Sequence, residues 1–258
     1  MAKYFTKPPI GTPLNKAHRL SQGLVGYWSF GEGAGGKTQD LSGNGNHGIL
    51  TNIVQGATSG WAGGKFGRAL NFDGVDDYVQ TELAPSGYTA ITMAAWVNLS
   101  AVGFYSMVLS SGTNADGVPE MRFFSDSGRM EIANRVNNVS VRDTVNVSGT
   151  GWHHFVGVAN GTTLTLYKDG ALVGSSTIAH NMNSSSPFRF ARRSNDEGGT
   201  YFPNASLDEV RIYNRVLSAD EVRQLYTDPF CMFEQESQYR WYVPSGAQVA
   251  NGNFFQFM

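Results

Sequence analysis

Short apolar runs separated by turn residues repeat along the chain from Gly23 to Tyr213. The odd-numbered residues from Ile91 to Leu99 are all apolar, which is the two-residue period of a β-strand. The dipeptides Asn160-Gly161 and Asp169-Gly170 separate three later runs, and both are typical of two-residue hairpin turns. The pattern therefore predicts an all-β, antiparallel protein. After the apolar burst that follows Gly23, the predicted strands cover residues 68–72, 77–79, 91–99, 104–109, 121–124, 130–135, 152–159, 163–167, 171–174, 188–191 and 207–213.

One helix is predicted, over residues 218–226. Ser218 and Glu221 have the spacing of a capping box, and Val222, Leu225 and Tyr226 form a single apolar stripe. A helix this short is not stable alone, so we expect it to pack on the sandwich.

The 258 residues divide into three parts by composition, and the central part is long enough for one β-sandwich domain. Residues 1–22 contain three prolines and no apolar period, which predicts an extended arm that docks on the body or reaches a neighbour, or else a disordered tail. Residues 23–226 form the predicted domain. Residues 227–258 are rich in aromatic side chains, which predicts a tail that buries itself on its own sandwich or on another subunit.

The glycine-rich stretch after the first predicted strand contains a possible metal-binding loop. From Asp40 to Asn46, oxygen-bearing side chains occupy alternate positions, and Gly45 follows the third. This is how a calcium loop begins. The twelfth position is Thr51, so a remaining carboxylate would have to come from a distant strand.

Charge and composition exclude several classes of function. The net charge is −2 and no block of basic residues occurs, so we expect no nucleic-acid binding. No apolar stretch approaches the ~20 residues of a membrane helix, and we expect neither membrane insertion nor a cleavable signal. Cys231 is the single cysteine, so no internal disulfide is possible.

Six segments, taken in order, resemble the concanavalin A-like lectin/glucanase domain of laminin G type. They span residues 23–226 and read GLVGYWSFGEGAGG, DLSGNGNHG, GKFGRALNFDGVDDYV, GWHHFVGV, LYKDGALVG and LDEVRIYNRVLSADEVRQLY. The flanks KPPIGTPLNKAHRLSQGLVGYW and LYTDPFCMFEQES resemble phage and prophage proteins that carry this domain.

The resemblance implies an antiparallel two-sheet jelly-roll β-sandwich with one short C-terminal helix. It also implies a structural calcium ion, held by Asp40, Asn44 and Asn46 from the loop and by Asp208. The alternative is that Asp40 and the asparagines cap turns through local hydrogen bonds and that Asp208 is exposed.

Catalysis is not expected. The glucanases of this superfamily place three carboxylates at alternate positions of one strand, and no such triplet occurs here. Asp76-Asp77 and Asp208-Glu209 are adjacent, so their side chains should face opposite sides of a strand. The same argument separates His153 from His154, which we interpret as packing residues.

The loop that begins at Arg192 carries the side chains best suited to recognition, because arginine and tyrosine bind sugars or protein surfaces and glycine lets a loop adapt. The alternative is a solvated surface loop. The predicted ligand-binding residues are Arg192, Arg193, Asn195, Asp196 and Tyr201.

The sequence thus predicts a non-catalytic, lectin-like structural or adhesive component of a phage virion, either a capsid decoration protein or a tail or fibre protein. Its expected partners are other virion subunits, bound through the arm and the tail, copies of itself in a homo-oligomer, and cell-surface glycans. We expect it to be made in the host cytoplasm and to reside in the virion. The alternatives are a free carbohydrate-binding lectin, extracellular or at the cell surface, and a glycoside hydrolase.

Overall fold

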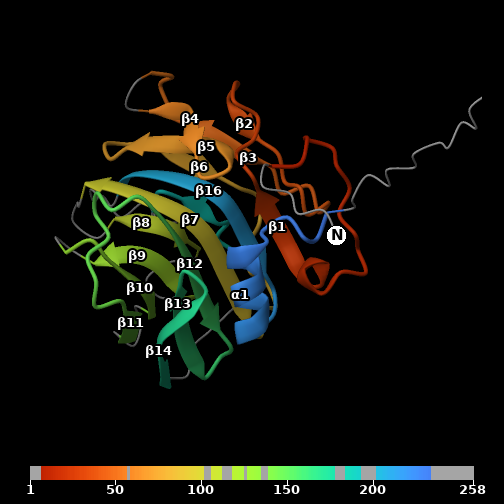
Figure 1. Ribbon diagram of the computed structural model, residues 1–258, viewed down its shortest axis with the longest axis vertical. Coiled ribbons are helices and arrows are strands. Elements are labelled where there is room, and N and C mark those ends of the chain that lie inside the picture. Colours follow the sequence, from red (N-terminus) through yellow and green to blue (C-terminus); the bar gives the residue numbers. More distant parts are fainter. Residues whose placement is uncertain are drawn as a thin grey trace, which may run out of the picture.

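The structure, a computed structural model, describes residues 7–56, 59–101, 106–111, 118–124, 127–134, 139–177, 184–192 and 202–233. Its strands form two antiparallel sheets stacked face to face (Figure 1). The predicted all-β sandwich with one helix is therefore confirmed.

Sheet 1 is built around β7 and β16, the two longest strands. Its order is β14 (Ala171–Thr177), β13 (Thr163–Lys168), β12 (Trp152–Ala159), β7 (Ile91–Ala101), β16 (Asn204–Tyr213), β5 (Gly67–Asp73) and β4 (Gly60–Gly64), with β1 (Leu24–Trp28) paired to β16. The hairpin between β13 and β14 turns at Asp169 and Gly170, which both have positive φ, as the Asp-Gly signal predicted.

Sheet 2 contains shorter strands, several of which the sequence did not predict. Its order is β11 (Val139–Arg142), β10 (Arg129–Asn134), β9 (Glu120–Phe124), β8 (Met107–Ser110), β15 (Arg189–Phe190), β6 (Tyr78–Gln80), β3 (Gly48–Thr51) and β2 (Lys37–Thr38). The strand β2 lies inside the glycine-rich stretch, where no strand was among those predicted, and its pairing with β3 stabilises it.

The main core lies between the two sheets and is aromatic at its centre. Trp28, Phe30 and Phe190 are fully buried there, and the Trp28 and Phe190 rings meet edge to face at 4.8 Å between centroids. Val79 and Ile132 reach the same core from sheet 2. Their strand neighbours, Gln80 and Glu131, therefore point to the outer face of sheet 2.

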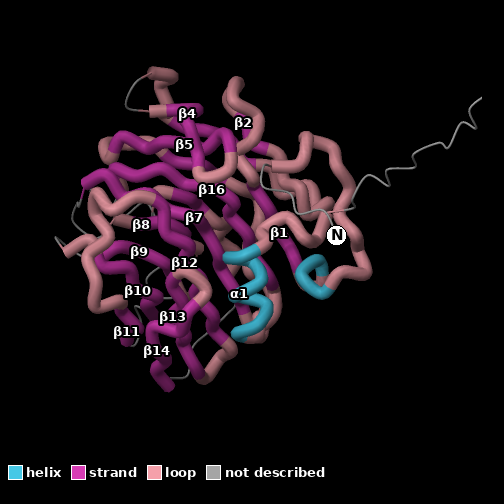
Figure 2. Tube along the Cα trace, in the orientation of Figure 1, coloured by secondary structure: helices cyan, strands magenta, loops and turns pink. Residues whose placement is uncertain are grey.

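A second core covers the outer face of sheet 1. The helix α1 (Ala219–Thr227) packs on this face through Val222 and Leu225 and begins with the predicted capping box. The segments 7–22 and 228–233 pack beside it, with Leu14 paired to Phe233 in a β-bridge. Figure 2 shows α1 and the short 3₁₀ helix η1 (Arg19–Ser21) on the same side of the molecule. The described part of the arm thus docks on the body, whereas residues 1–6 and 234–258 lie outside the described ranges.

Within the described ranges, no helix is long and apolar enough to cross a membrane.

Candidate functional site

The predicted calcium loop folds around the carboxylate of Asp40. Its Oδ1 accepts hydrogen bonds from the backbone N–H groups of Tyr27 and Ser42, both at 2.9 Å. Its Oδ2 accepts from Ser42 Oγ at 2.8 Å and from the Asn46 N–H at 2.9 Å. Four donors therefore surround this carboxylate, which holds the loop against β1.

The two predicted asparagine ligands serve as donors in this arrangement. The amide nitrogen of Asn46 donates to the carbonyl of Val25 at 2.9 Å, and that of Asn44 donates to the same carbonyl at 3.3 Å. The loop carbonyl of Ser42 accepts from Lys16 Nζ at 2.7 Å. As arranged, these groups do not fit a calcium ion, which needs oxygen ligands turned toward it. The calcium site stays a prediction.

Asp208, the fourth predicted ligand, has partners of its own on β16. Its Oδ1 lies 2.6 Å from Lys7 Nζ, and its Oδ2 accepts from the Phe66 N–H at 3.2 Å. Among the described residues, no hydrogen bond or ion pair joins Asp208 to the Asp40 loop. Burial, followed by the neighbouring Glu209 charge, raises the pKa of Asp208 to about 7.

Asp208 and Glu209 do not face opposite sides of the sheet, so that prediction is wrong. Both carboxylates are fully buried, and Lys7 Nζ lies 2.6 Å from the first and 3.8 Å from the second. The register of β16 shifts between Asp208 and Arg211, and Glu209 has φ 54°. This irregularity breaks the two-residue alternation on which the prediction depended.

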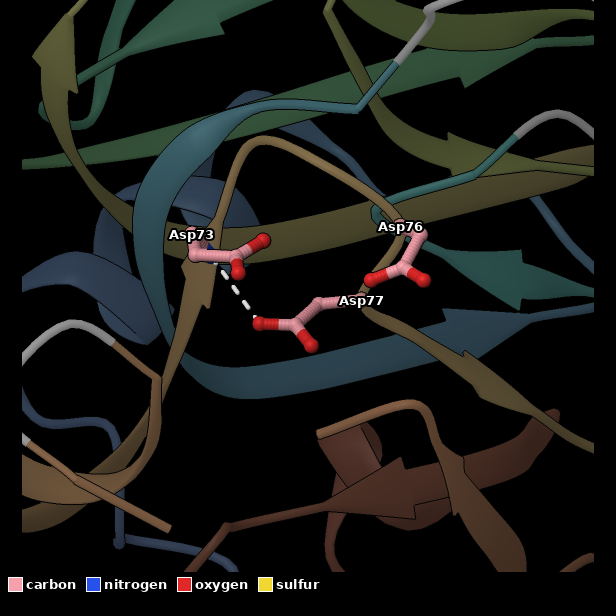
Figure 3. A group of neighbouring side chains, drawn as sticks. All are labelled: Asp73, Asp76 and Asp77. Atoms are coloured by element: carbon pink, nitrogen blue, oxygen red, sulfur yellow. Dashed lines mark hydrogen bonds between the residues drawn. The ribbon is translucent and has the colours of Figure 1, made fainter. Parts of the chain in front are cut away.

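Asp76 and Asp77 also lie together, because both belong to the turn before β6 rather than to a strand. One carboxylate oxygen from each of Asp73, Asp76 and Asp77 lies within 4.8 Å of the others (Figure 3). Asp77 is buried and accepts hydrogen bonds from Ser59 Oγ at 2.6 Å and from the Asp73 N–H at 3.0 Å. Burial raises its pKa. These bonds fix the shape of the turn, and we assign the cluster no ligand.

The two adjacent histidines have separate surroundings. His154 is fully buried beside Trp96 and Tyr226, and neither of its ring nitrogens has a hydrogen-bond partner in the described part of the chain. Burial, with the Arg211 charge, lowers its pKa to about 3. His153 Nδ1 lies 2.7 Å from Asp169 Oδ2 at the hairpin.

Arg192 is the one predicted ligand-binding residue that the structure describes. Its guanidinium lies over the ring of Tyr78, 4.6 Å from the ring centroid, and 5.9 Å from the centroid of Phe202. Arg189 approaches the same tyrosine at 5.9 Å, and its Nε donates to Gln80 Oε1 at 2.5 Å. We call these five residues the arginine–tyrosine cluster. Arg193, Asn195, Asp196 and Tyr201 lie outside the described residues.

The cluster lies on the outer face of sheet 2. Tyr78 and Gln80 flank the core residue Val79, and Arg189 precedes the core residue Phe190, so alternation directs all three away from the core. Tyr78, Arg192 and Phe202 are each partly exposed. The cluster therefore joins two cationic groups and two aromatic rings on one face.

A ladder of charges on the same face was missed by the sequence analysis. Glu131 is paired in register with Arg122 on one side and Arg142 on the other, and accepts from their Nε atoms at 2.6 and 2.9 Å. Arg122 also contacts Glu120 at 2.8 Å. Charged residues alternating with Met121 and Met130 were the available signal, but the pairing depends on the register between strands.

Comparison with known sequences decides the family. The sequence model of the concanavalin A-like lectin/glucanase superfamily, of laminin G type, matches residues 73–223, more than half of the 258-residue chain. The chain belongs to this superfamily. No curated protein matches the concanavalin A-like chain in sequence.

Solved structures share the fold at low sequence identity. The binding domain of Paraclostridial Mosquitocidal Protein 1 has TM-score 0.64 and 17% identity, covering 83% of this chain and 54% of that one. Domain 4 of AbnA, a GH43 extracellular arabinanase from Geobacillus stearothermophilus, has TM-score 0.61 and 17% identity, covering 79% and 98%. A Trypanosoma rangeli sialidase has TM-score 0.59 and 16% identity, covering 83% and 34%. The concanavalin A-like chain spans about half the length of the first of these.

Proposed function

We propose that this concanavalin A-like domain is a non-catalytic glycan-binding module, and that the arginine–tyrosine cluster is its binding site. The observation that carries the proposal is the position of this cluster. It lies on the outer face of sheet 2, whereas the described terminal segments and α1 cover the outer face of sheet 1. The outer face of sheet 1 is thus covered by the chain's own terminal segments, whereas the outer face of sheet 2 presents arginine and aromatic side chains.

The chemistry of the cluster suits a sugar. A guanidinium group donates several hydrogen bonds in a fixed fork, which matches a carboxylate or a pair of hydroxyl groups. An aromatic ring offers an apolar face with a defined orientation. Arg192 covers one face of the Tyr78 ring at 4.6 Å, so a sugar would contact the guanidinium and the partly exposed rings of Tyr78 and Phe202 beside it.

Two of the structural neighbours support a glycan ligand by analogy of fold. Domain 4 of AbnA was solved in complex with arabinotriose, and the Trypanosoma rangeli sialidase in complex with sialic acid. At this level of identity the fold alone is shared, so the ligand of this chain has to be tested directly.

The wider role that we propose is structural and adhesive, within a phage virion. The flanking segments that resemble phage proteins pair with each other through Leu14 and Phe233 on the side of sheet 1. Attachment of the module to other virion subunits through this side would leave the face of sheet 2 free for a cell-surface glycan. A homo-oligomer, measurable by light scattering on the purified chain, belongs to the same proposal.

A glycan array followed by variants tests the binding site. We expect the wild-type chain to bind a defined set of glycans, and R192A and Y78A each to weaken binding of the best array ligand by about ten-fold or more. R223A is the matched control, because this arginine of α1 is exposed and pairs with the exposed Asp220. Titration calorimetry with the array ligand provides the affinities.

Three results would contradict the proposal. These are an array without competable binding, R192A and Y78A affinities equal to that of R223A, and release of reducing sugar from the bound glycan. The last result would identify a hydrolase rather than a binding module.

A further inference from the structure

Two lysines of the N-terminal segment end at the two places where calcium ligands were predicted. Lys16 Nζ donates to the carbonyl of Ser42 at 2.7 Å, in the middle of the Asp40 loop. Lys7 Nζ lies 2.6 Å from Asp208 Oδ1. Both ammonium groups come from the segment that precedes the domain.

The surroundings of Lys7 Nζ resemble those of a bound cation. The ammonium group has three N–H donors, and it donates to the carbonyls of Ser29 and Arg68 as well as pairing with Asp208. Three oxygens from three separate parts of the chain therefore converge on one positive charge. The Lys7 side chain is only 10% exposed, so this charge lies inside the protein.

When both nearby carboxylates are ionised, the charges around Lys7 balance without a metal. Asp208 and Glu209 supply two buried carboxylates, and Lys7 and Arg211 supply two buried or nearly buried cations. Arg211 Nη2 lies 2.6 Å from Glu209 Oε2, and Tyr27 donates to the same oxygen at 2.5 Å. A divalent ion added to this group would leave an excess of positive charge, which is unfavourable in a buried site.

The Asp40 loop likewise leaves room for Lys16, whose side chain is exposed. A Cβ atom placed at Gly43 would lie 3.2 Å from Lys16 Nζ, and a small shift of the lysine would relieve this contact. Gly43 also has φ 88°, a conformation that favours glycine. All four hydrogen bonds to Asp40 come from the chain itself, which leaves this carboxylate no ligand position to offer.

We propose that the ammonium groups of Lys7 and Lys16 take the place of a calcium ion in this chain. Docking of the N-terminal segment then closes the loop and neutralises Asp208, so the fold does not depend on metal. The two lysines thus supply the positive charge. The Asp40 loop is then ordered only when the N-terminal segment is docked.

Metal content and thermal unfolding of the full chain test the proposal. We expect protein purified without chelator to contain far less than one calcium ion per chain by mass spectrometry. We expect its melting temperature to differ by no more than about 1 °C between calcium chloride and EGTA, because a ligand that binds the folded state would raise it. K16M should lower the melting temperature by about 2–4 °C, because Lys16 is exposed and water weakens its charge-assisted hydrogen bond.

K37M is the matched control, because Lys37 is exposed and forms no ion pair within the described residues. The melting temperature of K37M should equal that of the wild type. Stoichiometric calcium in the purified protein, or a melting temperature that rises by several degrees with calcium, would overturn the proposal. Equal melting temperatures for K16M and K37M would also overturn the proposal. None of these readouts depends on a glycan, so they are independent of the proposed binding function.

Discussion

Replacing Lys7 with methionine is expected to lower the free energy of unfolding by about 3–5 kcal/mol at pH 8. Methionine keeps most of the apolar stem but removes the ammonium group that faces Asp208 at 2.6 Å. Among the described residues, Asp208 and Glu209 would then share only Arg211 as a buried counter-charge. A buried, charged carboxylate without a partner is strongly unfavourable, and protonation lowers this cost by removing the charge.

The loss in K7M should therefore shrink at low pH. The pKa of Asp208 is about 7 in the folded chain, above its usual value near 4. Between about pH 4 and pH 7 the folded state holds a proton that the unfolded state has released, so the contribution of Asp208 to stability falls as pH rises. Removing Lys7 raises this pKa further, so we expect a smaller gap between variant and wild type at pH 5 than at pH 8.

Urea unfolding followed by tryptophan fluorescence at both pH values measures this effect. The control K37M should stay within about 0.5 kcal/mol of the wild type. Equal losses in K7M at pH 5 and pH 8, or a loss below about 1 kcal/mol at pH 8, would show that Lys7 does not neutralise a buried carboxylate.

Replacing His154 with phenylalanine should make the protein less sensitive to acid. The pKa of His154 is about 3 in the folded chain, because the ring is buried and Arg211 repels a second positive charge. The unfolded chain has a histidine pKa near 6.5. As pH falls below 6.5, His154 takes up a proton in the unfolded state but not in the folded state, so the free energy of unfolding decreases. Between pH 7 and pH 4 the loss is about 3 kcal/mol.

In H154F this contribution is absent, while the Trp96 and Tyr226 rings keep an aromatic neighbour. The unfolding free energies of variant and wild type are measured from pH 7 down to pH 4. Over this range, the difference between them should shift by about 3 kcal/mol in favour of H154F. The comparison cancels the carboxylates that both proteins share. Parallel curves would mean that His154 takes up its proton equally in both states.

The sequence predicted the parts of the fold that depend on local pattern. Alternation located β7, the Asp-Gly dipeptide located a hairpin, and Ser218 with Glu221 located the start of α1. Each of these signals acts between residues close in the chain, so no knowledge of distant contacts was needed.

Features set by contacts between distant segments were missed. Both faces of β7 are buried, because Tyr226 of α1 and Phe66 pack on Trp96, on the side that alternation alone would leave to solvent. The shared environment of Asp208 and Glu209 depends on a local irregularity in β16 and on Lys7, about two hundred positions earlier. Such pairings follow from the tertiary fold and leave no periodic signal.

The candidate site shows the same division. Arg192 was predicted from its loop, but its stacking on Tyr78 required β6 and β15 to be neighbours. Gln80 and Arg189 meet only because these strands pair in that register. Side-chain type was readable in advance, whereas the grouping of side chains on one face was not.

The bridge between Leu14 and Phe233 has a mechanical consequence. Because the two flanking segments run together there, opposite pulls applied through them would load this short pair and, on the N-terminal side, the buried contact of Lys7 with Asp208. Both contacts would have to break before the load passed to the pairing between the strands. The flanking segments would therefore detach first and lengthen the tether, while the two sheets stayed folded.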